Sequence, residues 1–428
     1  MTNEEKIFNV AILVLGDLNR SPRMLNHCVA LSESFPTIQE ISLIGYDSTD
    51  IRKDISSNTK IKRYNISNRI NKIFQHFPRI FFIFTSFFKI LFQIFSMFFI
   101  LFKIPKFSFL ILQNPPGIPS MFVCWLVCKL RKSKFIIDWH NYGYTILKVN
   151  KRPNFIVKIA EKYEKFFGKK SDMNLCVSQA EKRDLKKNFG IDAICLPDKP
   201  LLGLFKFLSS EQAPELYKKY KELNELLDKN RPILMISSTS WTPDEDFNIL
   251  LNSFIKTEEM IKNEHKLNNI KKVLFLITGK GPMKENFMKK VEKSNLNIFN
   301  VKSIWLDSDD YPKLLALCDL GICLHYSSSG IDLPMKVVDM FSACLPAAAI
   351  YYPTIEELVK NEENGFTFRN ERELSKILKN AIEEFSEKGK WEKIEKFRKR
   401  LKKDLNEENW VAQWKNRVKK AIIDKKFI

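Results

Sequence analysis

The stretch LHYSSSGIDLPMKVVDMFSACLP combines residue types that bind phosphate and ribose. Small residues, Ser327 to Gly330, follow an apolar run with strand character, and a helical pattern begins at Pro334. A strand, a small-residue loop and a helix start together aim backbone N–H groups and the positive helix end at an anion. Lys336 adds a charge, and Asp339, one turn further, can accept two ribose hydroxyls. The small residues alone would also fit an ordinary connection. The predicted nucleotide diphosphate site comprises Ser327, Ser328, Ser329, Gly330, Lys336 and Asp339.

Two further strand-end loops could join this site. In SSTSWTPDEDF, we expect Ser240 and Trp241 to face the donor, whereas the acidic cluster is explained by a helix cap. ITGKGP places Lys280 between two glycines, but it lacks the Gly-Lys-Ser/Thr ending of a phosphate-binding P-loop. Lys280 is therefore either a supporting cation near the nucleotide or a solvated loop lysine.

Three residues could take a proton. IDWHNYGY places Asp138 two residues before His140 at a predicted strand end, and a nearby carboxylate suits an imidazole that acts as a general base. A lone histidine is usually structural, so that alternative stays open. His140 is the first choice for the base, followed by Asp138 and by Asp17, which ends the first predicted strand. Asn114, in QNPPGIPS, and Tyr142 are expected on the acceptor side.

The run Asp307 to Asp310 contains the Asp-x-Asp spacing that chelates a metal in some sugar transferases. It also lies directly before a predicted helix, where acids are routine caps. We prefer the cap, and the five scattered histidines give no zinc pattern. No protein-bound metal or other cofactor is predicted.

Short apolar runs alternate with helical patterns, as in parallel sheets covered by helices on both faces. The rhythm occurs twice, which predicts an α/β chain of two doubly wound, Rossmann-like domains facing each other across a cleft. The expected parts are an N-terminal acceptor-side domain at 1–200, a charged linker at 201–230, a nucleotide-sugar domain at 231–385 and a basic helical tail at 386–428. Three tryptophans should pin this tail to the body: Trp391, Trp410 and Trp414.

The segment Ile80 to Phe102 carries a single charge, Lys89, and is long enough to cross a bilayer. A crossing would separate strands that belong to one sheet, so a membrane span and a wholly buried helix are the less favoured alternatives. We predict a helix that packs on the sheet with one face and enters one leaflet with the other, flanked by basic residues at headgroup level. The phenylalanines expected at the membrane are Phe87, Phe88, Phe95 and Phe98.

The excess of basic residues restricts the classes of molecule that the chain is expected to bind. The chain has 70 Lys and Arg against 50 Asp and Glu, a net +20, which suits an anionic membrane, nucleic acid or phosphorylated substrates. Codon bias toward Lys, Asn, Ile and Phe explains part of the excess. Nucleic acid is not expected, because no recognition module is visible. The eight cysteines have no paired spacing, which indicates buried thiols in a reducing compartment.

The motifs occur in the order and context of the chitobiosyldiphosphodolichol beta-mannosyltransferases, which the chain resembles from about Val10 to Phe368. The resemblance implies a GT-B fold and inverting transfer of mannose from GDP-mannose to GlcNAc-GlcNAc-diphospho-dolichol. It implies a β-1,4 linkage made at the cytosolic face of the endoplasmic reticulum membrane. The motifs that carry it are GDLNRSPRM, LQNPPGIPS, IDWHNYGY, SSTSWTPDEDF, ITGKGP and SSSGIDLPMKVVDMF.

The chain differs from the family in one respect, the expected mode of membrane attachment. Members of the family usually carry a transmembrane anchor before the first strand, whereas only Met1 to Lys6 precede it here, so the segment 80–102 is expected to supply attachment. Expected partners are the two substrates, the membrane surface and other glycosyltransferases of the dolichol pathway. The alternative of another class is a catalytically dead, membrane-bound subunit that only holds a lipid-linked sugar; its nucleotide motifs should be degraded, and these are not.

Overall fold

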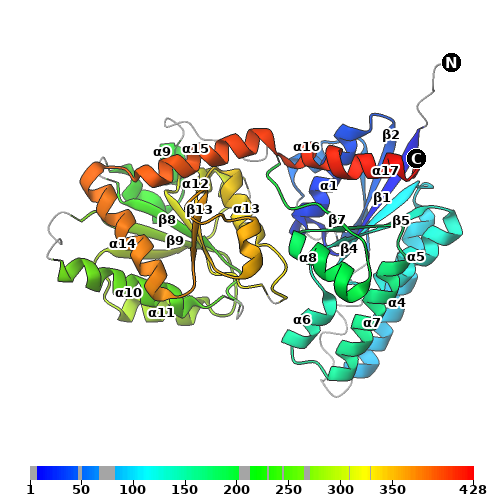
Figure 1. Cartoon of the computed structure of the whole chain (residues 1–428), viewed down its shortest axis with the longest axis horizontal. Coiled ribbons are helices and arrows are strands. Elements are labelled where there is room, and N and C mark those ends of the chain that lie inside the picture. Colours follow the sequence, from blue (N-terminus) through cyan, green and yellow to red (C-terminus); the bar gives the residue numbers. More distant parts are fainter. Residues whose placement is uncertain are drawn as a thin grey trace. The chain divides into compact units, whose positions relative to one another are not determined.

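The computed structural model describes residues 7–46, 51–66, 82–201, 213–228, 231–242, 245–264, 270–307, 309–327 and 329–428, with the side chains of 82–87 left out. The chain forms two compact units, each a parallel sheet with helices around it (Figure 1). Unit 1 contains Met1–Asp198 and Trp410–Ile428, and unit 2 contains Lys199–Asn409. The prediction of an α/β chain with two doubly wound domains is confirmed.

In its described part, unit 1 has a seven-stranded sheet in the order β3-β2-β1-β4-β5-β6-β7. Its central strands are buried along almost their whole length, because helices cover both faces. The strands are β1 (Phe8–Asp17), β2 (Ile38–Tyr46), β3 (Ile61–Asn65), β4 (Phe109–Asn114), β5 (Lys134–Trp139), β6 (Met173–Cys176) and β7 (Ile194–Cys195). The helices are η1 (Leu18–Arg20), α1 (Pro22–Ser34), α2 (Lys53–Ser56), α4 (Phe82–Lys103), α5 (Ser120–Arg131), α6 (Gly143–Val149), α7 (Asn154–Lys170), α8 (Gln179–Asp184), η3 (Leu185–Phe189), α16 (Trp410–Trp414), η7 (Lys415–Lys419) and α17 (Lys420–Asp424).

The strands of unit 1 are parallel and in register, so their carboxyl ends meet at one edge. Leu112 of β4 pairs with Leu13 of β1, and Asn114 pairs with Trp139 of β5. The loops that follow β1, β4 and β5 therefore leave the sheet side by side. Ligands bind at this edge in doubly wound sheets.

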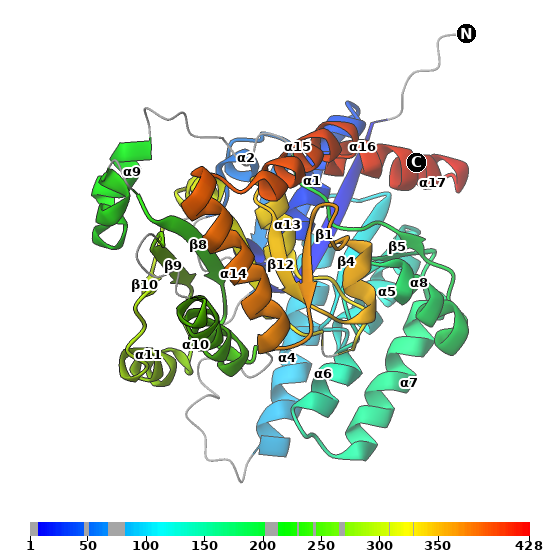
Figure 2. The ribbon, with the colours of Figure 1, turned by 60° about the vertical axis from the view of Figure 1, so that its left-hand side comes forward.

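The described part of unit 2 has a six-stranded sheet in the order β10-β9-β8-β11-β12-β13 (Figure 2). Alternate residues of β8 enter opposite cores, Met235 on one face and Leu234 and Ile236 on the other, because helices cover both faces. The strands are β8 (Ile233–Ser238), β9 (Val273–Thr278), β10 (Phe299–Ile304), β11 (Leu320–Cys323), β12 (Ala347–Ile350) and β13 (Gly365–Phe368). The helices are α9 (Ala213–Lys219), η4 (Lys221–Leu227), α10 (Phe247–Asn263), α11 (Lys284–Lys293), α12 (Tyr311–Leu317), α13 (Met335–Ser342), η6 (Pro353–Glu357), α14 (Glu371–Lys388) and α15 (Glu392–Glu407).

The tail, expected as one segment over 386–428, is divided between the two units. Trp391 stacks on Phe366 of unit 2, with ring centroids 5.2 Å apart. Trp410 and Trp414 are fully buried in unit 1, where α16 packs against α1. All three tryptophans are buried, which confirms that they pin the tail, although they pin its two parts to different units.

Helix α4 has two different faces. Met97 and Leu101 are fully buried, whereas Phe95 and Phe99 are 68% and 69% exposed. None of the helices, as far as their residues are described, has the length and apolar character that a membrane span requires. The eight cysteines are all buried thiols, as predicted.

Candidate active site

The carboxyl edge of unit 1 holds a buried carboxylate, Asp138, which accepts hydrogen bonds from three side chains. Arg23 donates from Nε at 2.8 Å and from Nη2 at 2.9 Å. His27 and His140 each lie with Nε2 close to Oδ2, at 3.0 and 2.9 Å. Burial disfavours the charged carboxylate, but Arg23, His140 and His27 together hold the pKa of Asp138 well below its usual range. Asp138 is therefore an anion at neutral pH and a very weak base.

Arg23 is a member of this cluster that the sequence analysis missed. It lies in the first turn of α1, and its Nη1 also donates to Asp198 at 2.9 Å and to the Leu196 carbonyl at 2.8 Å. Burial disfavours its charge, yet Asp138 and Asp198 raise its pKa. The signal that could have found it is its place in GDLNRSPRM, directly after the Pro22 that starts α1.

His140 is the member of this cluster that reaches solvent, with a side chain that is 22% exposed. When its Nε2–H donates to the Asp138 carboxylate, its Nδ1 keeps a lone pair that can take a proton. The structure thus brings two of the three predicted acid–base residues together. The third, Asp17, accepts a hydrogen bond from the Asn19 backbone N at 3.0 Å and caps η1.

Asn114 and Tyr142, predicted on the acceptor side, are buried supports of the loop that carries His140. Asn114 Nδ2 lies 3.3 Å from Oε1 of Glu164, and Tyr142 donates its hydroxyl to Asp184 at 2.7 Å. Glu164, which the sequence analysis missed, also accepts from the Gly143 N–H at 2.9 Å and so holds the start of α6. Burial raises the pKa of Glu164 to about 7.

In unit 2, the predicted phosphate loop is organised around Asp332, a further residue that the sequence analysis missed. Ser327 and Ser329 donate their hydroxyls to Asp332 Oδ1, the latter at 3.1 Å. The Gly330 N–H donates to Ser327 Oγ at 2.8 Å, and the positive φ of Gly330, 75°, favours glycine there. Ser328 lies outside the described residues. The described part of the loop thus follows β11 as predicted, with Ser327 and Ser329 held by a carboxylate.

Asp332 also faces His325, the residue two positions after β11. His325 Nε2 lies 3.6 Å from Asp332 Oδ2. Burial disfavours the charged form of Asp332, but His325 and Ser327 lower its pKa below the ordinary value. Asp332 is therefore an anion that contacts His325 before the loop and Ser327 and Ser329 within it.

Lys336 lies in the first turn of α13, as predicted, and forms an ion pair with Glu245. Glu245 is 2% exposed and also accepts from the Thr239 hydroxyl and, at 3.2 Å, from the Ser240 N–H. Asp339 lies three residues further along α13. Of the acidic cluster in this loop, Asp246 caps α10 as predicted, but Glu245 has another role: it links the loop after β8 to Lys336.

The loops after β8 and β9 touch through their backbones. A Cβ on Gly279 would lie 1.8 Å from the Thr239 carbonyl oxygen, and one on Gly281 would lie 2.1 Å from that of Ser240. These two glycines are therefore required, and they leave Lys280 between them exposed. Its Nζ lies 3.9 Å from the ring centroid of Trp305.

Trp241, predicted to face the donor, has a structural role instead. Its ring is fully buried and stacks on Phe247, with centroids 4.6 Å apart. Its Nε1 donates to the Gly279 carbonyl at 3.2 Å. Because apolar α10 and α11 residues surround the indole, it stabilises the loop and leaves Ser240 as the exposed member of the pair.

Asp310 occupies the predicted cap position before α12. Asp310 makes no cap hydrogen bond and instead binds Lys219 at 2.6 Å, Lys313 at 2.7 Å and the Tyr220 hydroxyl at 2.9 Å. Burial opposes its charge, but these donors lower the pKa of Asp310 to about 2. Asp307 also pairs with Lys219 at 2.6 Å. Among the residues with a described position, no group of three or more His, Cys, Asp and Glu could hold a metal ion.

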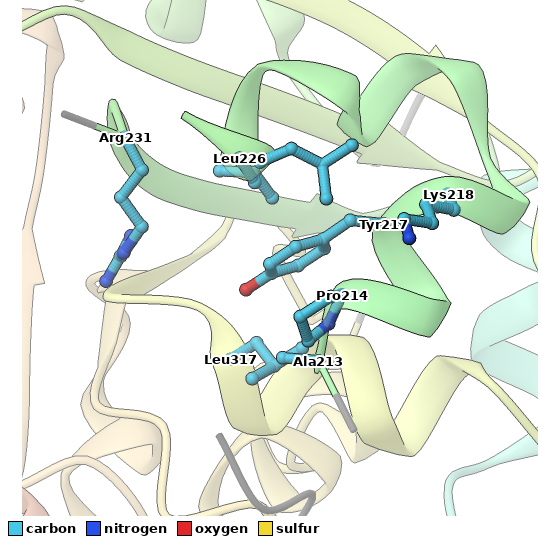
Figure 3. A pocket seen from close by; sticks show the side chains of 8 residues that line it. Ala213, Pro214, Tyr217, Lys218, Leu226, Arg231 and Leu317 are labelled. Atoms are coloured by element: carbon cyan, nitrogen blue, oxygen red, sulfur yellow. The ribbon is translucent and has the colours of Figure 1, made fainter. Parts of the chain in front are cut away.

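A separate cavity of about 530 Å³ lies in unit 2 (Figure 3). Arg231 precedes β8 and Leu317 precedes β11, so the cavity lies at the amino edge of the sheet, opposite to the loops described above. Arg231 is paired there with Asp319 at 2.9 Å. The predicted site residues of unit 2 are not part of this cavity.

The fold and the loops define a class of enzyme. Residues 224–404 match the family described as "Glycosyl transferases group 1". A solved glycosyltransferase from Rickettsia africae ESF-5 aligns with a TM-score of 0.68 at 16% identity, covering 99% of each chain. Two doubly wound units with this match identify a GT-B glycosyltransferase.

Two curated relatives show to which family of glycosyltransferases the chain belongs. The chitobiosyldiphosphodolichol beta-mannosyltransferase of Homo sapiens is 35% identical over 446 residues, 97% of this chain and 93% of the relative. That of Dictyostelium discoideum is 37% identical over 461 residues, 95% of this chain and 92% of the relative. This chain belongs to the family of chitobiosyldiphosphodolichol beta-mannosyltransferases, which confirms the resemblance.

Proposed function

We propose that this chain transfers mannose from GDP-mannose to GlcNAc-GlcNAc-diphospho-dolichol and makes a β-1,4 bond with inversion at the sugar carbon. The names of the relatives support the transferred sugar and the acceptor. The observation that carries the chemistry is the contact of His140 Nε2 with the buried Asp138 carboxylate at 2.9 Å. Inversion in a single displacement needs such a base, because the attacking hydroxyl must lose its proton as GDP leaves from the opposite face.

In this reaction, His140 Nδ1 takes the proton of the acceptor 4-hydroxyl. The hydroxyl oxygen forms a bond to the anomeric carbon while the bond from that carbon to the diphosphate oxygen breaks. Asp138 orients the imidazole and stabilises its positive charge, because the carboxylate is itself held ionised by Arg23. Asp138 therefore acts through His140.

The leaving GDP is assigned to unit 2. Lys336, at the start of α13, and the Ser327–Gly330 loop are assigned to the diphosphate, with Lys280 in support, and Asp339 is assigned to the ribose hydroxyls. Preorganised charge of this kind usually supplies the largest part of the rate enhancement. The proposal uses GDP-mannose as donor and includes no bound metal.

Single-turnover transfer with labelled GDP-mannose tests the base. His140→Gln should slow transfer by about 10²- to 10⁴-fold, since a glutamine amide cannot take the proton, while binding of labelled GDP stays unchanged. Asp17→Asn, at a candidate that caps η1, is the matched control and should stay within about threefold of the wild type. Transfer by His140→Gln at the wild-type rate would contradict the assignment. A chain that binds GDP but transfers nothing would instead be the non-catalytic lipid-sugar holder.

We also propose that unit 1 contacts the cytosolic face of the endoplasmic reticulum membrane. Most exposed large hydrophobic residues in the described chain lie on α4, α5, α6 and α7. On α4, Phe95 and Phe99 are one turn apart, and on α7, Phe155, Ile159 and Phe166 share a face and are 65%, 59% and 52% exposed. These spacings support two apolar stripes, of which only the first was expected.

Charge supports an anionic lipid surface as the partner of these stripes. The segment 148–170 has eight basic residues against two acidic ones, and one of the two acids, Glu164, is buried. Helices α4, α6 and α7 extend from the same end of unit 1 (Figures 1 and 2). Aromatic side chains would enter the interface while the lysines meet phosphate headgroups.

A further inference from the structure

The tail helix α16 reaches the acid–base cluster through one hydrogen bond. Trp414 Nε1 lies 2.9 Å from His27 Nδ1, and both side chains are fully buried. An indole N–H can only donate, so His27 Nδ1 must be the acceptor and carry no proton. The position of Trp414 therefore fixes the tautomer of His27.

Asp138 receives the proton of His27 and fixes the tautomer of His140. With Nδ1 unprotonated, neutral His27 carries its proton on Nε2 and donates it to Asp138 Oδ2 at 3.0 Å. The same oxygen accepts from His140 Nε2 at 2.9 Å, because an ionised carboxylate can only accept. The lone pair of His140 is then on Nδ1, the nitrogen that faces away from Asp138. A continuous chain of donors and acceptors runs from the tail to the base.

We propose that Trp414 is a positioning residue that keeps His27 neutral with its proton on Nε2, and that neutral His27 in turn preserves the charge balance around the His140 base. This inference rests on the proposed function, in which His140 is the base. A proton on His27 Nδ1 would face the Trp414 N–H, and two donors would oppose each other in a buried site. Trp414 therefore disfavours both the other tautomer and the imidazolium of His27.

The charges around His27 explain why its neutrality matters. Asp138 of β5, Arg23 of α1 and His140 act on His27. Asp198 after β7 pairs with Arg23, and the Cys176 thiol of β6 lies near Arg23. With neutral His27, two carboxylates oppose one guanidinium, and the proton taken by His140 balances the cluster. With a cationic His27 the cluster would be neutral before the reaction and would carry excess positive charge once His140 takes the proton. Burial lowers the pKa of His27 and outweighs the Asp138 carboxylate, which raises it, while Arg23 and His140 lower it further.

The chain offers a matched pair of variants. Trp414→Phe removes the donor to His27, whereas Trp410→Phe removes an equally buried indole N–H from the same helix, which donates at 2.9 Å to the backbone carbonyl of Asn26. The Trp410 ring lies 5.3 Å from the His27 ring and 5.1 Å from the Arg23 guanidinium, and a phenylalanine ring can keep both contacts. Trp414→Phe should lower kcat about tenfold and leave the KM for GDP-mannose within about twofold. Trp410→Phe should keep kcat within about twofold of the wild type, although it also loses a buried indole N–H.

Imidazole ¹⁵N NMR of the full chain, which has five histidines, reports the tautomer directly. His27 should stay neutral with its proton on Nε2 from about pH 5.5 to 8 in the wild type and in Trp410→Phe. In Trp414→Phe, it should titrate or populate the Nδ1–H form. An unchanged His27 spectrum in Trp414→Phe, or equal losses of kcat in the two tryptophan variants, would overturn the inference.

A second pair of variants, at His27, tests the inference if Trp414→Phe does not fold. His27→Gln can still accept from Trp414 and donate to Asp138 but cannot become a cation, whereas His27→Leu can do neither. His27→Gln should retain at least about tenfold more kcat than His27→Leu; equal kcat in the two would overturn the inference. A wild-type chain that transfers no mannose would overturn the proposed function and the catalytic part of this inference, whereas His27 found with its proton on Nδ1 would overturn the inference alone.

Discussion

At the residue scale, the candidate chemistry rests on buried carboxylates that are already paired. Asp138 is held by Arg23 and two histidines, Glu245 by Lys336 and the loop after β8, and Asp332 by serines. A paired carboxylate keeps its charge in a low-dielectric site and orients its partner. We therefore propose that His140 and Lys336, the partners of Asp138 and Glu245, are the residues next to the substrates and that these two carboxylates act through them.

Replacing Lys336 tests the diphosphate assignment. Lys336→Ala should lower turnover at least about tenfold, because a charge aimed at the leaving group is lost and the buried Glu245 carboxylate is left without its cation. The double variant Lys336→Ala with Glu245→Gln separates these effects in steady-state assays. If it stays impaired, Lys336 contacts the donor; recovery to wild-type turnover would show that the lysine only neutralises Glu245.

Asp339 is expected to hold the ribose from the second turn of α13. Asp339→Ala should raise the KM for GDP-mannose by roughly 10- to 100-fold, since a charged hydrogen bond is worth about 1.5 to 3 kcal/mol. Initial rates at varied donor and varied acceptor distinguish the subsites. A change confined to the acceptor KM would move this residue out of the donor site.

Glu164 makes the stability of the chain depend on pH. Its pKa rises from 4.5 in the unfolded chain to about 7 in the folded one. Its stabilising contribution is therefore full below the unfolded pKa and is lost as pH rises through 7. Glu164→Gln cannot ionise, so its stability relative to the wild type should increase by roughly 3 kcal/mol between acid and alkaline pH.

Thermal midpoints of the two proteins at pH 5 to 8.5 measure this difference. Parallel curves for Glu164→Gln and the wild type would show that Glu164 ionises as readily folded as unfolded.

At the scale of elements, the proposed membrane contact rests on exposed side chains of α4 and α7. These side chains can be replaced without changing the core of unit 1. Replacing exposed Phe95 and Phe99 by Ser, or Phe155 and Phe166 by Ser, should reduce flotation with anionic liposomes several-fold, because each buried CH₂ is worth about 0.8 kcal/mol. Long-chain acceptor use should fall more than short-chain use. Phe98, one of the four predicted contacts, is a poorer choice because it is partly buried against Phe102, and the side chain of Phe87 lies outside the described part.

Ile423→Ser on α17 provides the matched control, since Ile423 is 51% exposed in the same unit but outside the four helices. It should float as the wild type does. Equal flotation of all variants would place the lipid contact elsewhere.

The elements were largely predictable from the sequence because their signals are local. Apolar runs bounded by turns predicted the strands, and Pro22 and Pro334 predicted the starts of α1 and α13.

The paired acids were harder to predict. Glu164 follows Val157 and Ala160 on one helix face, so an acid at a core position was visible. Its partners, however, come from loops distant in sequence.

At the scale of the whole molecule, the fold and family were predictable, whereas the return of the tail was not. Residues Trp410 to Ile428 complete unit 1 although they follow all of unit 2. The sequence predicted that the tryptophans are buried, but it did not indicate in which of the two units each one lies. His27 was missed for the same reason, because its partner Trp414 is 387 positions away. Long-range pairings of this kind leave no local pattern.

The most direct test of the central claim is the product formed from GDP-mannose and a phytanyl or dolichyl chitobiose diphosphate. Mass analysis of the lipid should show the addition of one hexose, and a β-mannosidase should remove it while an α-mannosidase should not. UDP-sugars offered in place of GDP-mannose should give no product. Failure to extend the lipid, or a hexose released only by the α-mannosidase, would contradict the account.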